Sequence, residues 1–147
     1  MSRDEKKMHV SDGLEVHEAA ATGDADSLVE YLRTNKYDVN LKDSDWNDRA
    51  ALHWAAMRGF VECIRILLEH GADGVIRTDS GWTPAHCAGE TGKLTVLRAL
   101  HSAGVPLDLT DKYGDTPKDI AAIYGHHDCV QFLNHVAEEK EKDEHRT

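Results

Sequence analysis

One short pattern recurs four times along the chain, and this recurrence constrains the fold more than any other feature of the sequence. Each copy contains alanine and ends in glycine, and the glycines stand at positions 23, 59, 92 and 125. Successive copies are therefore 36, 33 and 33 residues apart. A fixed period of this length is typical of a solenoid, in which each unit buries its apolar face against its neighbours.

Each unit is expected to form two helices. The first is the alanine-containing stretch that ends in glycine, because alanine has the highest helix propensity and lets helices approach closely. The second helix follows the glycine and is amphipathic, as Val61, Ile64 and Leu67 indicate by their spacing in the second unit. A further glycine, such as Gly71, ends this helix, and an aspartate-rich segment of turn-forming residues follows.

Short motifs at fixed places in the unit carry a family resemblance. They are Gly81-Trp82-Thr83-Pro84-Ala85-His86 at the first helix, Gly71-Ala72-Asp73 after the second, and Asp38-Val39-Asn40. With these motifs, residues 13–137 resemble an array of ankyrin repeats. The resemblance implies an all-α fold, an ankyrin-repeat solenoid of helix-turn-helix units joined by fingers that are β-hairpins or loops.

The chain is expected to divide into three parts: a flexible N-terminal tail (1–12), the ankyrin repeat domain (13–137) and a charged C-terminal tail (138–147). Asp12 is a candidate N-cap for the first helix. The last helix is expected to run past Leu133 into the charged residues, because no glycine ends it. The four repeats span approximately 13–43, 44–78, 79–111 and 112–137.

Departures from the regular unit predict local differences. The gap of 36 residues implies three extra residues, one near 35–37 and two within 43–48, so the first finger is longer than the others. Ala50 replaces the threonine that begins the first helix in the last two units, and the lost cap costs about 1 kcal/mol. Thr116 and Asp119 keep the spacing of a capping box.

The composition argues against nucleic acid and membrane as partners. The chain has 17 Lys and Arg against 27 Asp and Glu, a net charge of −10, whereas phosphates require a cationic surface. No apolar run approaches the roughly 20 residues that span a bilayer, and the charged first residues are not expected to act as a secretory signal. Three widely spaced cysteines provide no disulfide framework, which favours a reducing compartment. We expect a cytoplasmic monomer, with a nuclear location as the alternative.

Histidines and cysteines invite a metal or catalytic interpretation, which their spacing does not favour. His17, His53 and His86 share one repeat position, and the resemblance implies that such a histidine bonds backbone and the threonine of its unit. The run His126-His127-Asp128-Cys129 has no second ligand cluster at zinc-site spacing, and Cys129 falls at a core position. The sequence also has no nucleophile or phosphate-loop motif. We expect no metal, no cofactor and no enzymatic activity.

We therefore expect the chain to function through a binding surface. The resemblance implies that the fingers and the exposed side of the first helices form a concave binding face, where aromatic and arginine side chains are typical of interface hot spots. The alternative for Trp46 and Trp82 is that they fold over the fingers and brace them, and Trp54 is expected in the core. The candidate partner-binding residues are Trp46, Asn47, Arg49, Met57, Arg58, Trp82, Glu90, Thr91, Tyr113, Asp115, Ile123 and Tyr124.

The fingers carry more acidic than basic residues. Residues 38–50, 73–83 and 106–117 together hold nine aspartates and four lysines or arginines. Part of this excess is turn chemistry, since aspartate is a common turn residue. We still expect a basic or mixed-charge protein partner, because such a face steers it during encounter. The leading interpretation is a non-catalytic adaptor, scaffold or inhibitor.

A passive substrate or a sensor is the second class of function. Asn40 lies in a Leu…Asp-Val-Asn context that resembles the sites where a 2-oxoglutarate-dependent oxygenase hydroxylates ankyrin asparagines. The equivalent positions carry Val75 and Asp108, so Asn40 is the asparagine candidate. The alternative is that Asn40 bonds the turn backbone. A redox response of the thiols belongs to the same class of function.

Overall fold

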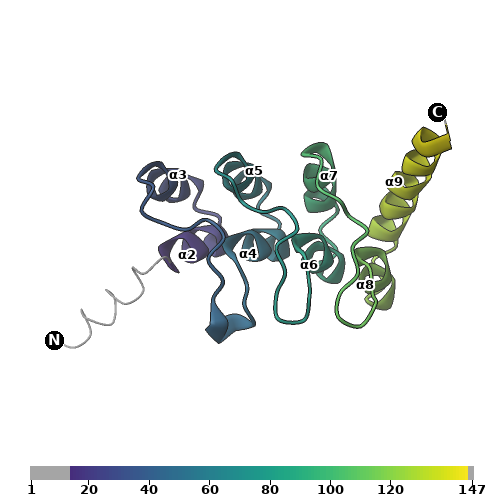
Figure 1. Cartoon of the computed structure of the whole chain (residues 1–147), viewed down its shortest axis with the longest axis horizontal. Coiled ribbons are helices and arrows are strands. Elements are labelled where there is room, and N and C mark those ends of the chain that lie inside the picture. The colour runs from purple at the N-terminus through teal and green to yellow at the C-terminus, as the bar shows by residue number, and fades with distance from the viewer. Residues whose placement is uncertain (1–13, 146–147) are drawn as a thin grey trace.

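Two rows of helices run side by side along the molecule (Figure 1). The computed structural model describes residues 14–145, and the helices of each row pack against their neighbours in the same row and against a partner in the other. The predicted all-α solenoid of helix pairs is confirmed. The inner row is α2 (Leu14–Thr22), α4 (Ala51–Arg58), α6 (Pro84–Thr91) and α8 (Pro117–Ile123), and the outer row is α3 (Ala25–Arg33), α5 (Val61–Glu69), α7 (Leu94–Ser102) and α9 (His127–His145).

The inner helices begin at defined caps. The Thr116 hydroxyl accepts from the Asp119 N–H at 3.2 Å, and the Asp119 carboxylate accepts from the Thr116 N–H at 2.9 Å, which confirms the predicted capping box. Ala50 has no hydroxyl to offer α4, but the Nδ1 atom of His53 accepts the Ala50 N–H at 3.0 Å. The repeat that lacks the threonine therefore keeps one of the two hydrogen bonds of a capping box, the one from the N-cap backbone N–H to the histidine side chain.

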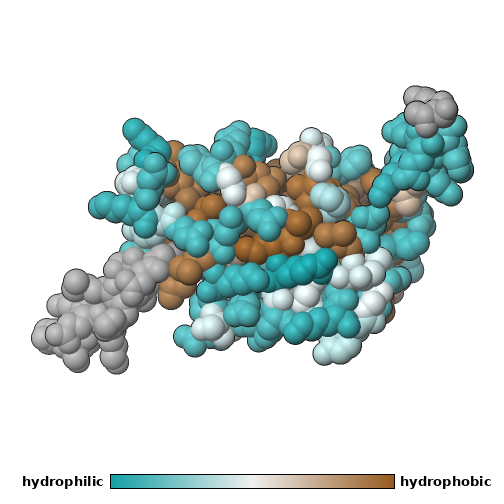
Figure 2. Space-filling view, in the orientation of Figure 1, coloured by the Kyte–Doolittle hydropathy of each residue, from teal (hydrophilic) through white to brown (hydrophobic). Residues whose placement is uncertain are grey.

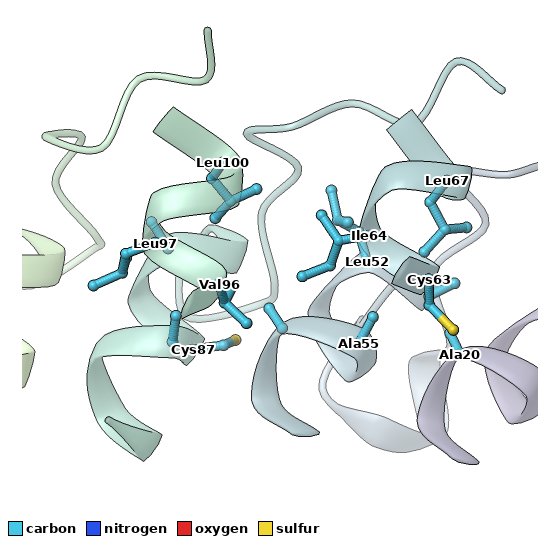
Figure 3. Packing of buried hydrophobic residues seen from close by; sticks show 14 of the residues in the cluster. Ala20, Leu52, Ala55, Cys63, Ile64, Leu67, Cys87, Val96, Leu97 and Leu100 are labelled. Atoms are coloured by element: carbon cyan, nitrogen blue, oxygen red, sulfur yellow. The ribbon is translucent and has the colours of Figure 1, made fainter. Parts of the chain in front are cut away.

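The core lies between the two rows. Five large aliphatic side chains there are at most 1% exposed and belong to one packed cluster (Figure 3): Leu52, Ile64, Leu67, Leu97 and Leu100. Each inner helix buries at least one alanine completely, among them Ala20, Ala55, Ala88 and Ala121, so the inner helices approach closely. Since a buried leucine contributes several kcal/mol, this continuous core holds neighbouring repeats together.

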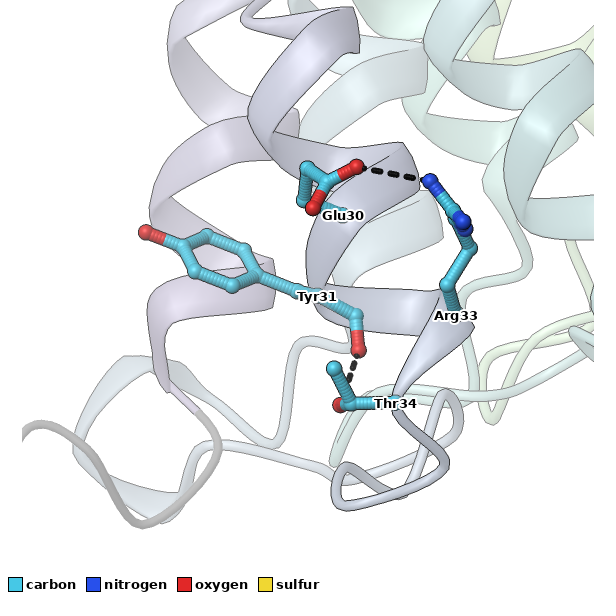
Figure 4. A network of polar contacts seen from close by, with 4 residues as sticks. All are labelled: Glu30, Tyr31, Arg33 and Thr34. Atoms are coloured by element: carbon cyan, nitrogen blue, oxygen red, sulfur yellow. Dashed lines mark hydrogen bonds and ion pairs between the residues drawn. The ribbon is translucent and has the colours of Figure 1, made fainter.

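The end of α3 shows how the first repeat manages without a closing glycine. The Thr34 hydroxyl donates to the Tyr31 carbonyl at 2.8 Å, and Arg33 pairs with Glu30 at 2.9 Å (Figure 4). Asn35 then takes the left-handed conformation, with φ of 58°. Asparagine tolerates this conformation better than most residues, so it substitutes for the glycine found at this point in later repeats.

Each finger is closed by one backbone hydrogen bond, and these bonds set the register. The pairs are Asp43 N–H to Arg49 carbonyl, Thr78 to Trp82, and Asp111 to Asp115, at 2.8–2.9 Å. The first pair spans two more residues than the others, so the predicted enlargement of the first finger is confirmed.

The third extra residue lies just after α3. Asp38 and Asp73 each accept the N–H two residues on, from Asn40 and Val75, and therefore mark equivalent points. Asp38 is three residues beyond Asn35, whereas Asp73 is two beyond Gly71. The predicted extra residue near 35–37 is confirmed.

The fingers are loops rather than strand hairpins. Within residues 14–145 the β-structure consists of one isolated antiparallel bridge, between Asp43 and Arg49. The inserted residues form a short 3-10 helix, η1 (Ser44–Trp46), followed by Asn47 and Asp48 in the left-handed conformation. Of the two finger forms expected from the sequence, the loop is the one formed.

The last helix continues well beyond the core. α9 runs to His145, so residues 138–145, expected as a charged tail, form exposed helix. Lys140 Nζ lies 3.1 Å from Asp108 Oδ2 and ties this extension to the preceding loop. The expected N-terminal tail, 1–12, and the Asp12 cap lie outside the described residues.

The surface combines apolar and hydrophilic areas. On the face shown in Figure 2, apolar residues gather along the middle of the array, with hydrophilic residues on either side. No helix within residues 14–145 has the length and apolar character needed to cross a membrane. Large hydrophobic side chains are exposed at Trp46 (55%), Tyr113 (80%), Ile123 (68%) and Tyr124 (52%).

Candidate protein-binding face

The twelve predicted binding residues divide by exposure. Half of them are open to solvent, and the other half are partly covered by neighbouring residues of the same repeat or the next. The exposed group is Trp46, Asn47, Arg58, Tyr113, Ile123 and Tyr124, and the half-buried group is Arg49, Met57, Trp82, Glu90, Thr91 and Asp115.

Trp82 is held in place by the next finger. Its indole Nε1 donates to Asp111 Oδ2 at 2.9 Å, and its ring stacks on His86 with 6.0 Å between centroids. Trp82 supplies the carbonyl of the hydrogen bond that closes its finger, as Arg49 and Asp115 do in theirs, so these three positions are equivalent. Trp82 therefore does not share the repeat position of Trp46 or Tyr113. Its contacts match the alternative given above, in which the tryptophan folds over the fingers and braces them.

Trp46 belongs to a different arrangement, which we name the Trp54 cluster: Trp46, Arg49, Trp54 and Arg58. The Trp46 ring meets the Trp54 ring edge-on, with 5.7 Å between centroids. The guanidinium carbons of Arg49 and Arg58 lie 5.1 and 5.8 Å from the Trp54 ring centroid. The inserted finger thus reaches back over α4, and two cations and two indoles gather beside that helix.

The expectation that Trp54 lies in the core is wrong. Trp54 is half-buried, whereas Cys87 at the same position of α6 is 2% exposed. The inner helices meet at Ala55 and Ala56, both fully buried, and so narrow an interface accommodates a thiol but not an indole. The signal that could have placed it is the spacing of Trp54 to Arg58, i to i+4, which puts both on one helix face.

The two arginines of the cluster have no acidic partner within residues 14–145. Arg58 donates to the Ala21 carbonyl at 3.4 Å. By contrast, Arg33 and Arg65 on the outer helices pair with Glu30 and Glu62. The cluster is therefore a local cationic site in a chain whose net charge is −10.

Equivalent positions of the inner helices extend this face along the array. Met57, Glu90 and Ile123 follow one another on α4, α6 and α8, one repeat apart each time. Each inner helix packs against the next, so the three side chains form a row. Thr91, beside Glu90, uses its hydroxyl internally, donating to the Cys87 carbonyl at 2.9 Å. The row runs from the Trp54 cluster, through an acidic residue, to the exposed apolar end at Ile123 and Tyr124.

The repeat histidines stabilise the array. The Nε2 atoms of His17, His53 and His86 lie 2.8–2.9 Å from the carbonyls of Leu41, Trp82 and Asp115 in the following fingers. Burial lowers the pKa of His53 to about 4, so its ring is neutral, accepts at Nδ1 and donates at Nε2. The predicted bond to backbone is confirmed for all three histidines, and the predicted bond to the threonine of the unit forms at His86, whose Nδ1 lies 2.9 Å from the Thr83 hydroxyl oxygen.

Asp111 is the buried acid of the third finger. Its Oδ1 accepts from the N–H groups of Tyr113 and Asp115, both at 2.9 Å, and its Oδ2 accepts from Trp82. Desolvation raises its pKa, but these hydrogen bonds to the ionised carboxylate outweigh that effect and lower the pKa below its ordinary value. The carboxylate is therefore fixed in its charged form beneath the candidate face.

Comparison with known proteins decides the family. Residues 16–111 and 74–143 match the family model described as "Ankyrin repeats (3 copies)". The chain is an ankyrin repeat protein.

Its relatives include regulators of other proteins. The chain is similar to human "Protein phosphatase 1 regulatory subunit 27", with 38% identity over 98 residues, 67% of this chain and 62% of that protein, and to its mouse counterpart at 36%. It is also similar to "Cyclin-dependent kinase inhibitor 2A" of Monodelphis domestica, with 36% identity over 127 residues, 84% of this chain and 71% of that protein. The chain thus spans about three fifths of the phosphatase subunits it matches.

The thiols of this ankyrin repeat protein are inside the array. Cys63, Cys87 and Cys129 are free and buried, and burial raises the pKa of Cys87 to about 12 and that of Cys129 to about 11. Cys129 is a core residue, as predicted, and the neighbouring His126 donates from Nε2 to the Glu90 carbonyl at 2.9 Å. Across residues 14–145 no three His, Cys, Asp or Glu side chains gather as a metal site would require.

Asn40 connects two consecutive repeats. Its Oδ1 accepts from the Asp73 N–H at 2.8 Å, and its Nδ2 donates to the Gly71 carbonyl at 3.4 Å. The side chain therefore bonds backbone, as the structural alternative expected, but the backbone belongs to the next repeat rather than to its own turn.

Proposed function

We propose that this ankyrin repeat chain is a non-catalytic adaptor, scaffold or inhibitor that binds a protein partner on its concave face. The observation that carries the proposal is the exposure of Trp46, Tyr113, Ile123 and Tyr124. These side chains come from the fingers and the inner helices, and tryptophan, tyrosine and arginine are the residues enriched in interface hot spots. The relatives named as a phosphatase regulatory subunit and a kinase inhibitor support the same class of function.

The proposed partner is of mixed charge. The acidic fingers favour encounter with basic segments, while the Trp54 cluster presents two cationic groups within the same face. We include in the proposal that the chain acts as a monomer in a reducing compartment such as the cytoplasm. Three buried free thiols are consistent with such a compartment.

Hydroxylation of Asn40 is a second candidate function. Asn40 is only half-buried, and it lies in a loop rather than in a helix, so an oxygenase could reach it after the local hydrogen bonds open. A one-oxygen mass increase at Asn40, in protein isolated from cells, is the expected evidence. A thiol sensor is the weaker alternative, because reactive cysteines are exposed and have lowered pKa values, whereas Cys63, Cys87 and Cys129 are buried.

The test is capture of partners from lysate by the wild type and by matched variants. The double variant Trp46→Ala with Tyr113→Ala is expected to lose the captured proteins while keeping its melting temperature, because both side chains are exposed. Arg65→Glu, on the outer face of α5, is the control and is expected to retain them. If the folded double variant keeps every partner while the control loses them, the binding face lies on the other side of the array.

A further inference from the structure

We infer that the partner segment carries a carboxylate that binds Arg49 and Arg58, a basic side chain that meets Glu90, and an apolar side chain that covers Ile123. The inference rests on the proposed concave face and specifies what that face recognises. The inner helices α4, α6 and α8 would then contact three side chains in succession, one acidic, one basic and one apolar, along a single extended segment of the partner protein.

The orientation of the two arginines supports the first element. Both guanidinium groups lie near the Trp54 ring rather than near a carboxylate, although the chain has 27 acidic residues to offer. A guanidinium over an aromatic ring keeps the N–H donors at its rim available, and those donors match the two oxygens of a carboxylate. The exposed Trp46 ring beside them covers one edge of the site.

The surrounding charge favours a single carboxylate over a phosphate group or a polyanion. Asp43, Asp45 and Asp48 lie in the same finger as Trp46 and Arg49. These acids repel a dianion more strongly than a monoanion, and the net charge of −10 repels an extended nucleic acid backbone. An aspartate or glutamate flanked by basic residues satisfies both the cluster and its acidic rim.

The remaining elements follow from the row on α4, α6 and α8. Glu90 has no basic partner within the described residues, so a partner lysine or arginine can pair with it. Beyond it, Ile123 is 68% exposed and Tyr124 is 52% exposed, which suits an aliphatic or aromatic residue.

Helix spacing sets the distances along the segment. Adjacent packed helices are about 8–10 Å apart, so α4 and α8 are separated by roughly 16–20 Å. An extended chain covers about 3.3–3.6 Å per residue, so the apolar residue is expected about five or six positions from the acid, with the basic residue near the middle.

The experiment selects binders from a random peptide library displayed on phage, using the full chain as bait and a library long enough to cover the row. For the wild type we expect enrichment of Asp or Glu, a basic residue about three positions away, and an apolar residue about three positions further. Binding of synthetic peptides with the selected sequence is then measured against the same peptides carrying Asn or Gln in place of the acid.

Matched variants assign each element to its residue. Arg49→Gln with Arg58→Gln should remove the preference for the acid and weaken the selected peptides by about tenfold, and Arg49→Glu with Arg58→Glu should replace it by a basic preference. Glu90→Gln should remove only the basic preference. Arg65→Gln, in the outer row, is the control and should change neither. If the double glutamine variant proves unstable, the single variants Arg49→Gln and Arg58→Gln are used instead, and each should weaken the preference for the acid.

The outcomes separate this inference from the proposed function. If the selected peptides lack the acid but do not bind the double variant Trp46→Ala with Tyr113→Ala, the inference is overturned and the proposed binding on the concave face stands. Peptides that bind equally well to that double variant overturn both. An acidic preference that survives in Arg49→Gln with Arg58→Gln, or peptides that require phosphorylation for binding, also overturns the inference, as does a selection that yields no acidic preference at all.

Discussion

The indole nitrogen of Trp82 lies 2.9 Å from Oδ2 of Asp111, one finger further along the chain. The other oxygen of Asp111 closes its own finger by accepting two backbone N–H groups. A single buried carboxylate therefore fixes the shape of one finger and joins it to the finger before. This bond explains why Trp82 is half-buried beneath the proposed binding face, while Trp46 and Tyr113 are exposed there.

Replacing Asp111 by alanine should destabilise the array. The change leaves the Trp82 indole and two backbone N–H groups without their acceptor, and a buried unsatisfied donor costs about 1–3 kcal/mol. Urea unfolding followed by circular dichroism measures the loss. Asp108→Ala is the control, because the Asp108 carboxylate is exposed and, among residues 14–145, its ion pair is with Lys140 on the surface, where such pairs contribute little. Equal losses in the two variants would contradict a coupling role for Asp111.

Stability should fall with decreasing pH because of the buried histidines. The pKa of His53 is about 4 in the folded chain and about 6.5 when unfolded, and that of His86 is also lowered by burial. Between these values the unfolded chain binds more protons, so folding stability is complete above pH 6.5 and is lost as the pH falls toward 4. For His53 alone the loss from pH 7.5 to pH 5 is about 2 kcal/mol.

The glutamine variant at position 53 isolates this effect. His53→Gln retains a side-chain N–H for the Trp82 carbonyl but has no group that titrates, so its urea midpoint should change less between pH 7.5 and pH 5. His127→Gln, at an exposed position, should retain the wild-type dependence. A wild-type pH dependence in His53→Gln would assign the acid sensitivity to other groups.

The repeat period was enough to predict the helix pairs, the buried leucines and the lengths of the insertions. Period and spacing report which positions face the core, and Leu67 and Leu100 are buried accordingly. They do not report the volume available at a given position. Trp54 shows this limit, because its position holds a buried cysteine in the next repeat and the indole is too large to be enclosed there.

The Trp54 cluster itself could not be predicted from the repeat. It depends on the path of the inserted finger, in which Asn47 adopts a left-handed conformation with no counterpart in the other two fingers, whereas Asp48 takes the left-handed position held there by Gly81 and Gly114. These turns bring Trp46 and Arg49 back over α4. A consensus repeat contains no information about an insertion, so only the structure relates these side chains to Trp54 and Arg58.

The thiols should be unreactive in the folded chain. Raising the pKa of Cys87 from about 9 to about 12 lowers its thiolate fraction about a thousandfold at neutral pH, and burial also blocks the reagent. Titration with a disulfide reagent should therefore show slow modification in buffer and complete, rapid modification in urea. Rapid labelling of any cysteine in the folded chain would revive the sensor interpretation.

Two glycines offer a matched test of packing between α6 and the loop before α9. Gly92 and Gly104 both adopt left-handed backbone, with φ of 71° and 81°, so alanine costs about 1 kcal/mol at either position. A Cβ at Gly92 would lie 2.6 Å from Nδ1 of His126, whereas a Cβ at Gly104 would meet no atom within 4 Å.

Gly92→Ala should therefore lose more stability than Gly104→Ala, by about 1 kcal/mol, because the His126 ring must move and give up its bond to the Glu90 carbonyl. Urea unfolding of both variants gives the difference directly. In a His126→Ala background the two glycine variants should lose equal stability, because the additional loss in Gly92→Ala depends on contact with the His126 ring. The loss caused by Gly104→Ala should be the same with and without His126, because that position has no contact with the ring. If Gly92→Ala and Gly104→Ala lose the same amount, the close approach of His126 does not constrain this turn, and left-handed strain accounts for the whole effect.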